Sequence, residues 1–210
     1  MKLADYLSPL PFCAVLRGIT PEEIEPVCRA LADTGFRILE VPLNSPRPFD
    51  SIRLLAQHFG GNCLVGAGTV IDPADVDRVA DAGGNLVVMP HSDVRVISAA
   101  KRRGMICMPG VATPTEAFAA LAAGADGLKM FPAEALPPAA LKAWRAVLPR
   151  GTLVFAVGGM RPDTLRPYWE AGADGFGTGS NLYRPGMPAD EVATAARAYR
   201  DGVRALPARG

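Results

Sequence analysis

Ala123-Gly124-Ala125-Asp126-Gly127-Leu128-Lys129-Met130-Phe131-Pro132 is the stretch from which the fold can be inferred. Gly124 is suited to end a helix, because glycine adopts the left-handed conformation of a helix C-terminus at little cost. The apolar run that follows, Gly127–Phe131, predicts a short strand. The same Ala-Gly-Ala-Asp-Gly phrase returns at residues 171–175. The chain therefore repeats a unit in which a helix leads directly into a strand.

Working outward from this stretch, helices and strands alternate along the whole chain. Strands are predicted at eight places: Phe12–Arg17, Arg37–Pro42, Cys63–Ala67, Leu86–Met89, Met105–Met108, Gly127–Phe131, Leu153–Val157 and Gly175–Thr178. Helices are predicted at Pro21–Thr34, Pro46–Phe59, Pro73–Ala82, Val94–Arg103, Thr115–Ala123, Pro138–Leu148, Pro162–Ala171 and Ala189–Leu206. Helix starts carry a capping hydroxyl or carboxylate followed by proline, as in Thr113-Pro114 and Asp72-Pro73.

Eight strand–helix units predict an α/β fold, specifically a compact (β/α)₈ TIM barrel that forms a single domain over residues 1–210. The alternative is a doubly wound sheet with a dinucleotide site. No GxGxxG follows the first predicted strand, which weakens that alternative.

The composition excludes several classes of partner. The net charge is +1 and no block of basic residues occurs, so a nucleic acid partner is not expected. No stretch approaches the roughly 20 apolar residues of a membrane span, and the N-terminus lacks the apolar run of a signal peptide. The four cysteines are widely spaced without a CxxC, so we expect neither a disulfide framework nor a metal site. We expect a cytoplasmic protein.

Lys129 and Glu40 are the candidate catalytic residues. Alternation along a strand places Lys129 on one face with Phe131, and burial lowers a lysine pKa and leaves more of the free amine that attacks ketones. Glu40 ends the second predicted strand and could move protons for such a lysine. Two alternatives stay open: a structural lysine paired with some buried carboxylate, or a Glu40–Lys129 ion pair that holds the barrel together.

Glycine-rich turns follow the last two predicted strands, at Val157-Gly158-Gly159 and Gly177-Thr178-Gly179-Ser180. Barrels commonly bind phosphate there, and Ser180 is predicted at the start of the following helix, where it could add a hydroxyl. Tight turn geometry alone would also explain these glycines. Arg17, at the end of the first predicted strand, could bind a carboxylate or phosphate, or form a surface ion pair.

Five motifs together resemble the 2-keto-3-deoxy-6-phosphogluconate/galactonate aldolases across essentially the whole chain. They are Arg17-Gly18-Ile19, Glu40-Val41-Pro42-Leu43-Asn44-Ser45-Pro46, Gly66-Ala67-Gly68-Thr69-Val70, Leu128-Lys129-Met130-Phe131-Pro132-Ala133 and Val157-Gly158-Gly159.

This resemblance implies a metal-independent, cofactor-free class I aldolase. Such an enzyme splits a phosphorylated sugar acid, its small-molecule partner, into pyruvate and D-glyceraldehyde 3-phosphate. Lys129 would form the Schiff base, and Glu40, through a water, would deprotonate the C4 hydroxyl. The implied substrate-binding residues are Arg17 and Thr69 at the carboxylate end or hydroxyls, Pro90 and Phe131 lining the pocket, and Gly158, Gly159, Gly179 and Ser180 at the phosphate. Family members are trimers, so a homotrimer is expected.

Two departures place the chain nearer the galactonate branch than the gluconate branch. The run Leu43-Asn44-Ser45 stands where the gluconate branch has Leu-Arg-Thr, and Val157 stands where it has threonine. A threonine hydroxyl can hydrogen-bond the C4 oxygen of one epimer, whereas valine presents an apolar wall. We expect a preference of about tenfold for the galacto epimer. The alternatives are a gluconate-type or dual-specificity aldolase, and a phosphosugar-binding barrel without catalysis.

Overall fold

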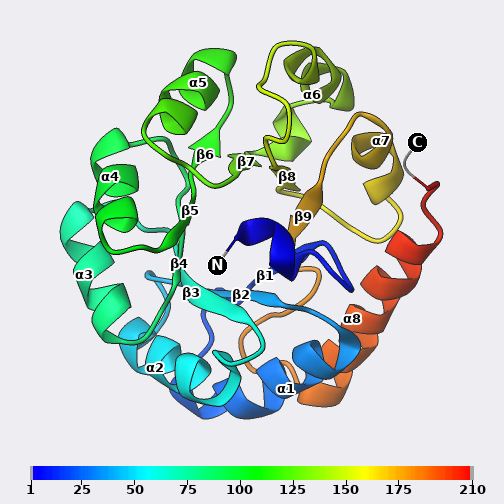
Figure 1. The fold of residues 1–210 in the computed structure, drawn as a ribbon. Helices are drawn as coiled ribbons and strands as arrows, with labels where there is room; N and C mark the ends of the chain where they lie inside the picture. The colour runs from blue at the N-terminus through cyan, green and yellow to red at the C-terminus, as the bar shows by residue number, and fades with distance from the viewer. Residues whose placement is uncertain (1, 209–210) are drawn as a thin grey trace.

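Parallel strands form a ring at the centre of the protein, and helices surround that ring (Figure 1). The computed structural model describes residues 2–208, so residue 1 and residues 209–210 of the predicted domain lie outside the described part. The strands are β1 (Phe12–Val15), β2 (Ile38–Pro42), β3 (Leu64–Gly68), β4 (Leu86–Val88), β5 (Ile106–Met108), β6 (Gly110–Val111), β7 (Leu128–Met130), β8 (Val154–Val157) and β9 (Gly175–Thr178). The α-helices are α1 (Ile24–Thr34), α2 (Pro48–Phe59), α3 (Pro73–Asp81), α4 (Val94–Arg102), α5 (Pro114–Ala122), α6 (Pro138–Arg145), α7 (Leu165–Glu170) and α8 (Ala189–Arg204). Three short 3₁₀ helices complete the described part of the chain: η1 (Leu3–Tyr6), η2 (Pro21–Glu23) and η3 (Ala133–Ala135).

The predicted barrel is confirmed, with one difference in strand count. The sheet order is β5-β4-β3-β2-β1-β9-β8-β7-β6, and each neighbouring pair is parallel. The two ends of that order, β5 and β6, are separated in the chain only by Pro109. Proline has no N–H to donate to a ladder, so the fifth position of the ring is divided into two strands. Residues 2–208 therefore hold nine strands where the sequence predicted eight.

The repeated Ala-Gly-Ala-Asp-Gly phrase has a structural explanation. Asp126 accepts a hydrogen bond from the Cys107 N–H (2.9 Å) and pairs with Lys101 (2.6 Å). In the second copy, Asp174 accepts from the Val154 N–H (2.8 Å) and pairs with Arg145. Each aspartate thus joins the start of its own strand to the preceding strand and to a helix.

Alternation along the strands separates two buried layers. Side chains such as Ile38, Leu64 and Phe155 pack inside the ring, and Lys129 and Phe131 share that inward direction. Leu128 and Met130 belong to the larger layer between the ring and the helices. A lysine thus occupies an interior position that apolar residues fill on other strands.

Two helix starts that were predicted from capping residues are confirmed. Thr113 and Glu116 form a reciprocal capping box at α5, and the Asp72 side chain caps α3. The helix predicted from Pro162 begins instead at Leu165, because the N–H of Thr164 bonds the Arg161 carbonyl (2.9 Å) in a separate turn. Likewise α2 begins at Pro48, two residues after its predicted start.

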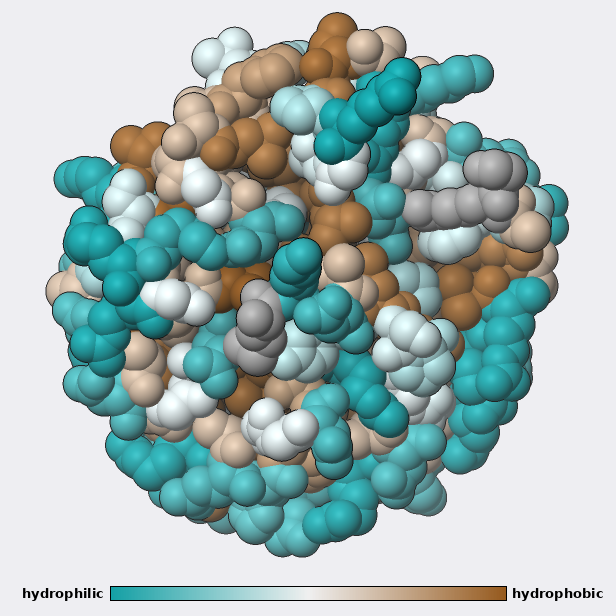
Figure 2. All heavy atoms as spheres, in the orientation of Figure 1, coloured by the Kyte–Doolittle hydropathy of each residue, from teal (hydrophilic) through white to brown (hydrophobic). Residues whose placement is uncertain are grey.

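The 3₁₀ helix η1 lies over the middle of the ring in Figure 1. Leu3 of η1 packs into the interior layer beside Gly127, at the end of the ring where β7 begins. The predicted site residues lie at the opposite end of the ring, where the strands end. Figure 2 shows mainly hydrophilic residues around the helical rim, as expected for helices that bury one face. Across residues 2–208, the structure has no helix with the length and apolarity required to cross a membrane.

Candidate active site

A pocket of about 520 Å³ opens where the strands end. It brings together Lys129 and all nine predicted substrate-binding residues: Arg17, Thr69, Pro90, Phe131, Val157, Gly158, Gly159, Gly179 and Ser180. Glu40 does not line the pocket, since its side chain is buried beneath it with 1% of its surface exposed. A cavity of this size fits a small organic ligand.

The Lys129 amine faces the pocket and has no bonded partner among the described residues. The side chain is only 7% exposed, and its Nζ lies 4.6 Å from the centre of the Phe131 ring. Within residues 2–208 the amine forms no ion pair within 4.0 Å and no side-chain hydrogen bond. Burial lowers the pKa of Lys129, and the positive charge of Arg17 acts in the same direction, while the Glu40 carboxyl opposes them. The site therefore increases the fraction of the neutral, nucleophilic amine.

Glu40 lies on β2 with its side chain inside the ring. Burial raises its pKa to about 7, although the positive charges of Lys129 and Arg17 act in the opposite direction. One of its carboxyl oxygens, Oε2, is buried and has no hydrogen-bond partner in the part of the chain that the structure describes. A carboxyl that gains and loses its proton near neutral pH, with a free oxygen, is suited to act as an acid and a base.

The two residues do not form the ion pair that the sequence left open. Among the described residues, no carboxylate oxygen lies within 4.0 Å of the Lys129 amine. Their charges act on each other's pKa values through space, which places both groups in the same interior. The space beside Glu40 is provided by Gly68, since a Cβ built there would lie 1.8 Å from Oε2.

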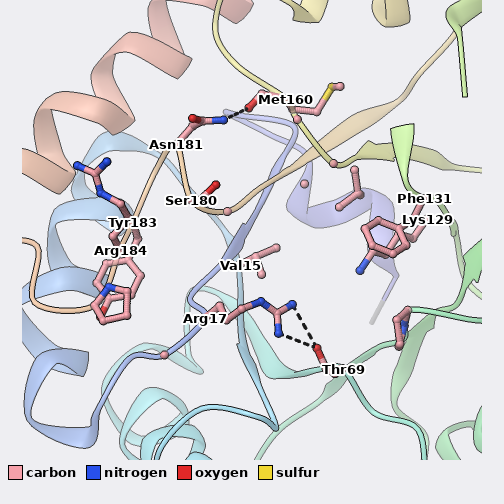
Figure 3. Close-up of a pocket in the computed structure, with 18 residues that line it drawn as sticks. Val15, Arg17, Thr69, Lys129, Phe131, Met160, Ser180, Asn181, Tyr183 and Arg184 are labelled. Atoms are coloured by element: carbon pink, nitrogen blue, oxygen red, sulfur yellow. Dashed lines mark hydrogen bonds between the residues drawn. The ribbon is translucent and has the colours of Figure 1, made fainter. Parts of the chain in front are cut away.

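Arg17 is held by neutral oxygens and forms no ion pair in the described part of the chain. Its guanidinium donates to Oδ1 of Asn44 (2.6 Å) and, at 3.4 Å, to Oγ1 of Thr69 (Figure 3). Thr69 has a φ of 56°, an uncommon left-handed conformation for threonine. The Gly18 N–H next to Arg17 donates to Oγ of Ser45 (2.9 Å). Arg17 thus presents to the pocket a positive charge that has no ion-pair partner within residues 2–208.

The two glycine-rich turns lie at different places around the pocket, and the turn at Gly158 is beside Pro132, directly after Phe131, because β7 and β8 pair. Gly158 and Gly159 adopt φ values of 112° and 65°, which glycine alone adopts readily. Figure 3 shows Ser180 on the opposite side of the pocket from Lys129. Ser180 was predicted at a helix start, and that prediction is wrong. The residues after Gly179 form a turn, and α8 begins only at Ala189, after prolines and a glycine.

Sequence reasoning missed part of the lining. Eight pocket residues were not predicted: Val15, Gly18, Met160, Gly177, Asn181, Tyr183, Arg184 and Pro185. Most of them directly follow Ser180 or Gly159, so extending the two predicted loops by a few residues would have found Asn181, Tyr183 and Met160. Arg184 carried the clearest signal, as a cation four residues after Ser180.

The site combines a buried lysine amine that has no bonded partner within residues 2–208, a buried carboxyl inside the ring and glycine-rich turns. This combination in a parallel barrel is typical of aldolases that work through a lysine imine. The family described as "KDPG and KHG aldolase" matches residues 4–196. The chain belongs to this family.

Named relatives are similar over nearly the whole chain. A "Probable 2-dehydro-3-deoxy-6-phosphogalactonate aldolase" of Rhizobium meliloti (strain 1021) is 51% identical over 87% of this chain and 86% of its own. A "2-dehydro-3-deoxy-6-phosphogalactonate aldolase" of Escherichia coli (strain K12) is 46% identical over 95% of this chain and 100% of its own. The solved structure described as "Native KDPGal structure" matches with a TM-score of 0.92 and 44% identity, covering 97% of this chain and 98% of the other.

Proposed function

We propose that this protein is a class I aldolase that cleaves 2-dehydro-3-deoxy-6-phospho-D-galactonate to pyruvate and D-glyceraldehyde 3-phosphate. The observation that carries the proposal is the Lys129 amine, which is buried, has no bonded partner within residues 2–208 and faces the pocket. The names of the relatives at 51% and 46% identity support the choice of substrate.

The reaction begins at Lys129. Its neutral amine attacks the C2 ketone, and loss of water gives an imine that is protonated on nitrogen. Breaking the C3–C4 bond then sends its electron pair toward that nitrogen and produces an enamine. Protonation of the enamine at C3 and hydrolysis of the imine release pyruvate and regenerate the amine. The lowered pKa of Lys129 increases the fraction of amine available for the first step.

Glu40 moves the protons that this sequence requires. As a carboxylate it removes the proton from the C4 hydroxyl, through a water, so that C4 leaves as an aldehyde. The resulting carboxylic acid returns a proton to C3 of the enamine. One group serves both steps because its pKa of about 7 lies near neutral pH, so neither protonation state is strongly disfavoured.

The two ends of the pocket orient the substrate. Arg17, fixed by Asn44 and Thr69, binds the C1 carboxylate with its positive charge. The backbone of the glycine-rich turns and Ser180 bind the phosphate on C6, and of these Ser180 lies on the opposite side of the pocket from Lys129. C2 is thereby brought to the amine, while C4 lies between the two ends.

The preference for the galacto epimer rests on Val157. Its isopropyl group faces the pocket and packs closely against Gly177, where an added Cβ would lie 2.7 Å from Cγ2. This apolar wall offers no hydrogen bond to a C4 oxygen. The alternative is a gluconate-type or dual-specificity aldolase with the same mechanism, which a comparison of the two epimers decides.

The decisive experiment is sodium borohydride reduction in the presence of pyruvate, followed by mass mapping. A stable adduct on Lys129 is expected, and its absence there contradicts the Schiff-base mechanism. Pyruvate release from the galacto and gluco epimers, measured side by side with EDTA present, then tests substrate preference and metal independence. Cleavage of neither epimer would favour the alternative of a phosphosugar-binding barrel without catalysis. The cytoplasmic location and the homotrimer stay predictions.

A further inference from the structure

The loop after β9, residues 179–186, supplies the phosphate side of the pocket and is held from outside by one carboxylate. Glu23, in η2, accepts hydrogen bonds at Oε1 from the Tyr183 hydroxyl (3.0 Å) and from the Gly186 N–H (2.9 Å). Glu23 itself does not line the pocket. Its two bonds fix the loop on either side of Arg184, the loop's cation.

The second oxygen of Glu23 is bonded to the connection between β1 and α1. Oε2 accepts from the N–H (2.9 Å) and the hydroxyl (3.0 Å) of Thr20. Partial burial raises the pKa of Glu23, but the hydrogen bonds from Thr20, Gly186 and Tyr183 outweigh it and hold the pKa below its usual value. Glu23 is therefore an ionised carboxylate that joins two loops 160 residues apart in the chain.

The same two loops also touch at Gly18. A Cβ built on Gly18 would lie 2.6 Å from Cγ of Pro185. Gly18 follows Arg17, whose guanidinium faces the opposite end of the pocket, and is itself bonded to Ser45. The loops that carry the carboxylate-binding end and the phosphate-binding end therefore contact each other, and Glu23 accepts hydrogen bonds from both loops.

We propose that Glu23 is a positioning residue for the phosphate end of the pocket: it holds loop 179–186 so that Ser180 and the neighbouring backbone meet the phosphate of the substrate. This inference rests on the proposed aldolase function. Glu23 acts through Tyr183 and Gly186 and touches no reacting atom. Its loss should weaken the recognition of phosphate and leave the lysine chemistry intact.

The test compares Glu23→Ala with the matched variant Glu116→Ala. Both glutamates belong to capping boxes with a threonine three residues earlier, but only Glu23 contacts loop 179–186. In Glu23→Ala we expect KM for the phosphorylated substrate to rise about tenfold, the loss typical of hydrogen bonds to a charged group, with a smaller change in kcat. Competitive inhibition by inorganic phosphate should weaken by a similar factor. Exchange of the pyruvate methyl protons in D₂O, which needs Lys129 but no phosphate, should stay within twofold of wild type.

Tyr183→Phe removes one hydrogen-bond donor to Glu23 and leaves the capping box intact. This variant therefore tests the role of Glu23 if Glu23→Ala does not fold. About a threefold rise in KM is expected. The proposal is overturned if KM in both variants stays within twofold of the Glu116→Ala value, or if proton exchange falls in parallel with cleavage. A wild-type enzyme that forms no pyruvate adduct on Lys129 counts against the proposed function. A wild type that forms it, with KM unchanged in both variants, counts against the role of Glu23 alone.

Discussion

Substituting Glu40 with glutamine should abolish efficient cleavage and also change how stability depends on pH. Glu40 is fully buried, and burial raises its pKa from 4.5 to about 7. The folded protein therefore binds this proton more tightly than the unfolded chain does. The stabilisation is present below pH 4.5 and is lost as the pH rises through 7. Glu40→Gln has no such proton, so its stability lacks this contribution.

The size of the effect follows from the two pKa values. Integrating the proton linkage between pH 5 and pH 8 gives about 2.5 kcal/mol, by which wild-type stability should fall relative to Glu40→Gln. The absolute stability of the variant matters less, because an unpartnered amide replaces an unpartnered carboxyl oxygen at the same buried place. The change of this difference with pH reports the ionisation of Glu40 together with its coupling to Lys129.

Urea unfolding of both proteins at several values between pH 5 and pH 8 measures this difference. Glu25→Gln is the control for removing a glutamate charge, since the Glu25 side chain is more than half exposed on α1. Parallel stability curves for wild type and Glu40→Gln would refute the argument that burial raises the pKa of Glu40. The rate of cleavage should rise with pH through about 7 in wild type, as the base ionises.

Three further substitutions have specific expected outcomes. Lys129→Arg keeps a positive charge but loses the nucleophile, so cleavage should fall by more than about a thousandfold and no borohydride adduct should form; retained cleavage would remove Lys129 from the mechanism. Gly68→Ala places a Cβ 1.8 Å from Oε2 of Glu40, so the carboxyl must move. We expect kcat/KM to fall about a hundredfold while borohydride still traps pyruvate, and an unchanged kcat/KM would show that the carboxyl position is not critical. Val157→Thr is nearly isosteric and should shift the galacto-to-gluco ratio of kcat/KM about tenfold toward gluco, and an unchanged ratio would assign specificity elsewhere.

The barrel was predictable because its signals are local. A glycine after most helices, a proline at the first turn of several of them and a short apolar run can each be recognised within a few residues. The division of the fifth strand at Pro109 was not recognised, although proline at that point explains it. The late start of α7 depends on a turn closed by Thr164, which competes with the helix that the preceding proline suggested.

The site was predictable to the extent that it follows strand alternation. Lys129 and the nine predicted binding residues line one pocket, because each comes from a strand or from the loop that follows it. Contacts between distant loops have no local signal. The bond between Tyr183 and Glu23 spans 160 residues, and the space that Gly68 leaves for Glu40 depends on the pairing of β2 with β3.

The separation of Glu40 from Lys129 explains why both pKa values are displaced toward neutrality. A direct ion pair would stabilise both charged forms, lowering the pKa of the acid and raising that of the lysine. Here burial dominates each group, and their mutual attraction only partly offsets it. The protein thereby keeps an amine that can attack and a carboxyl that can exchange protons. Gly68 is the residue that makes this arrangement possible, since any larger side chain there would displace the carboxyl.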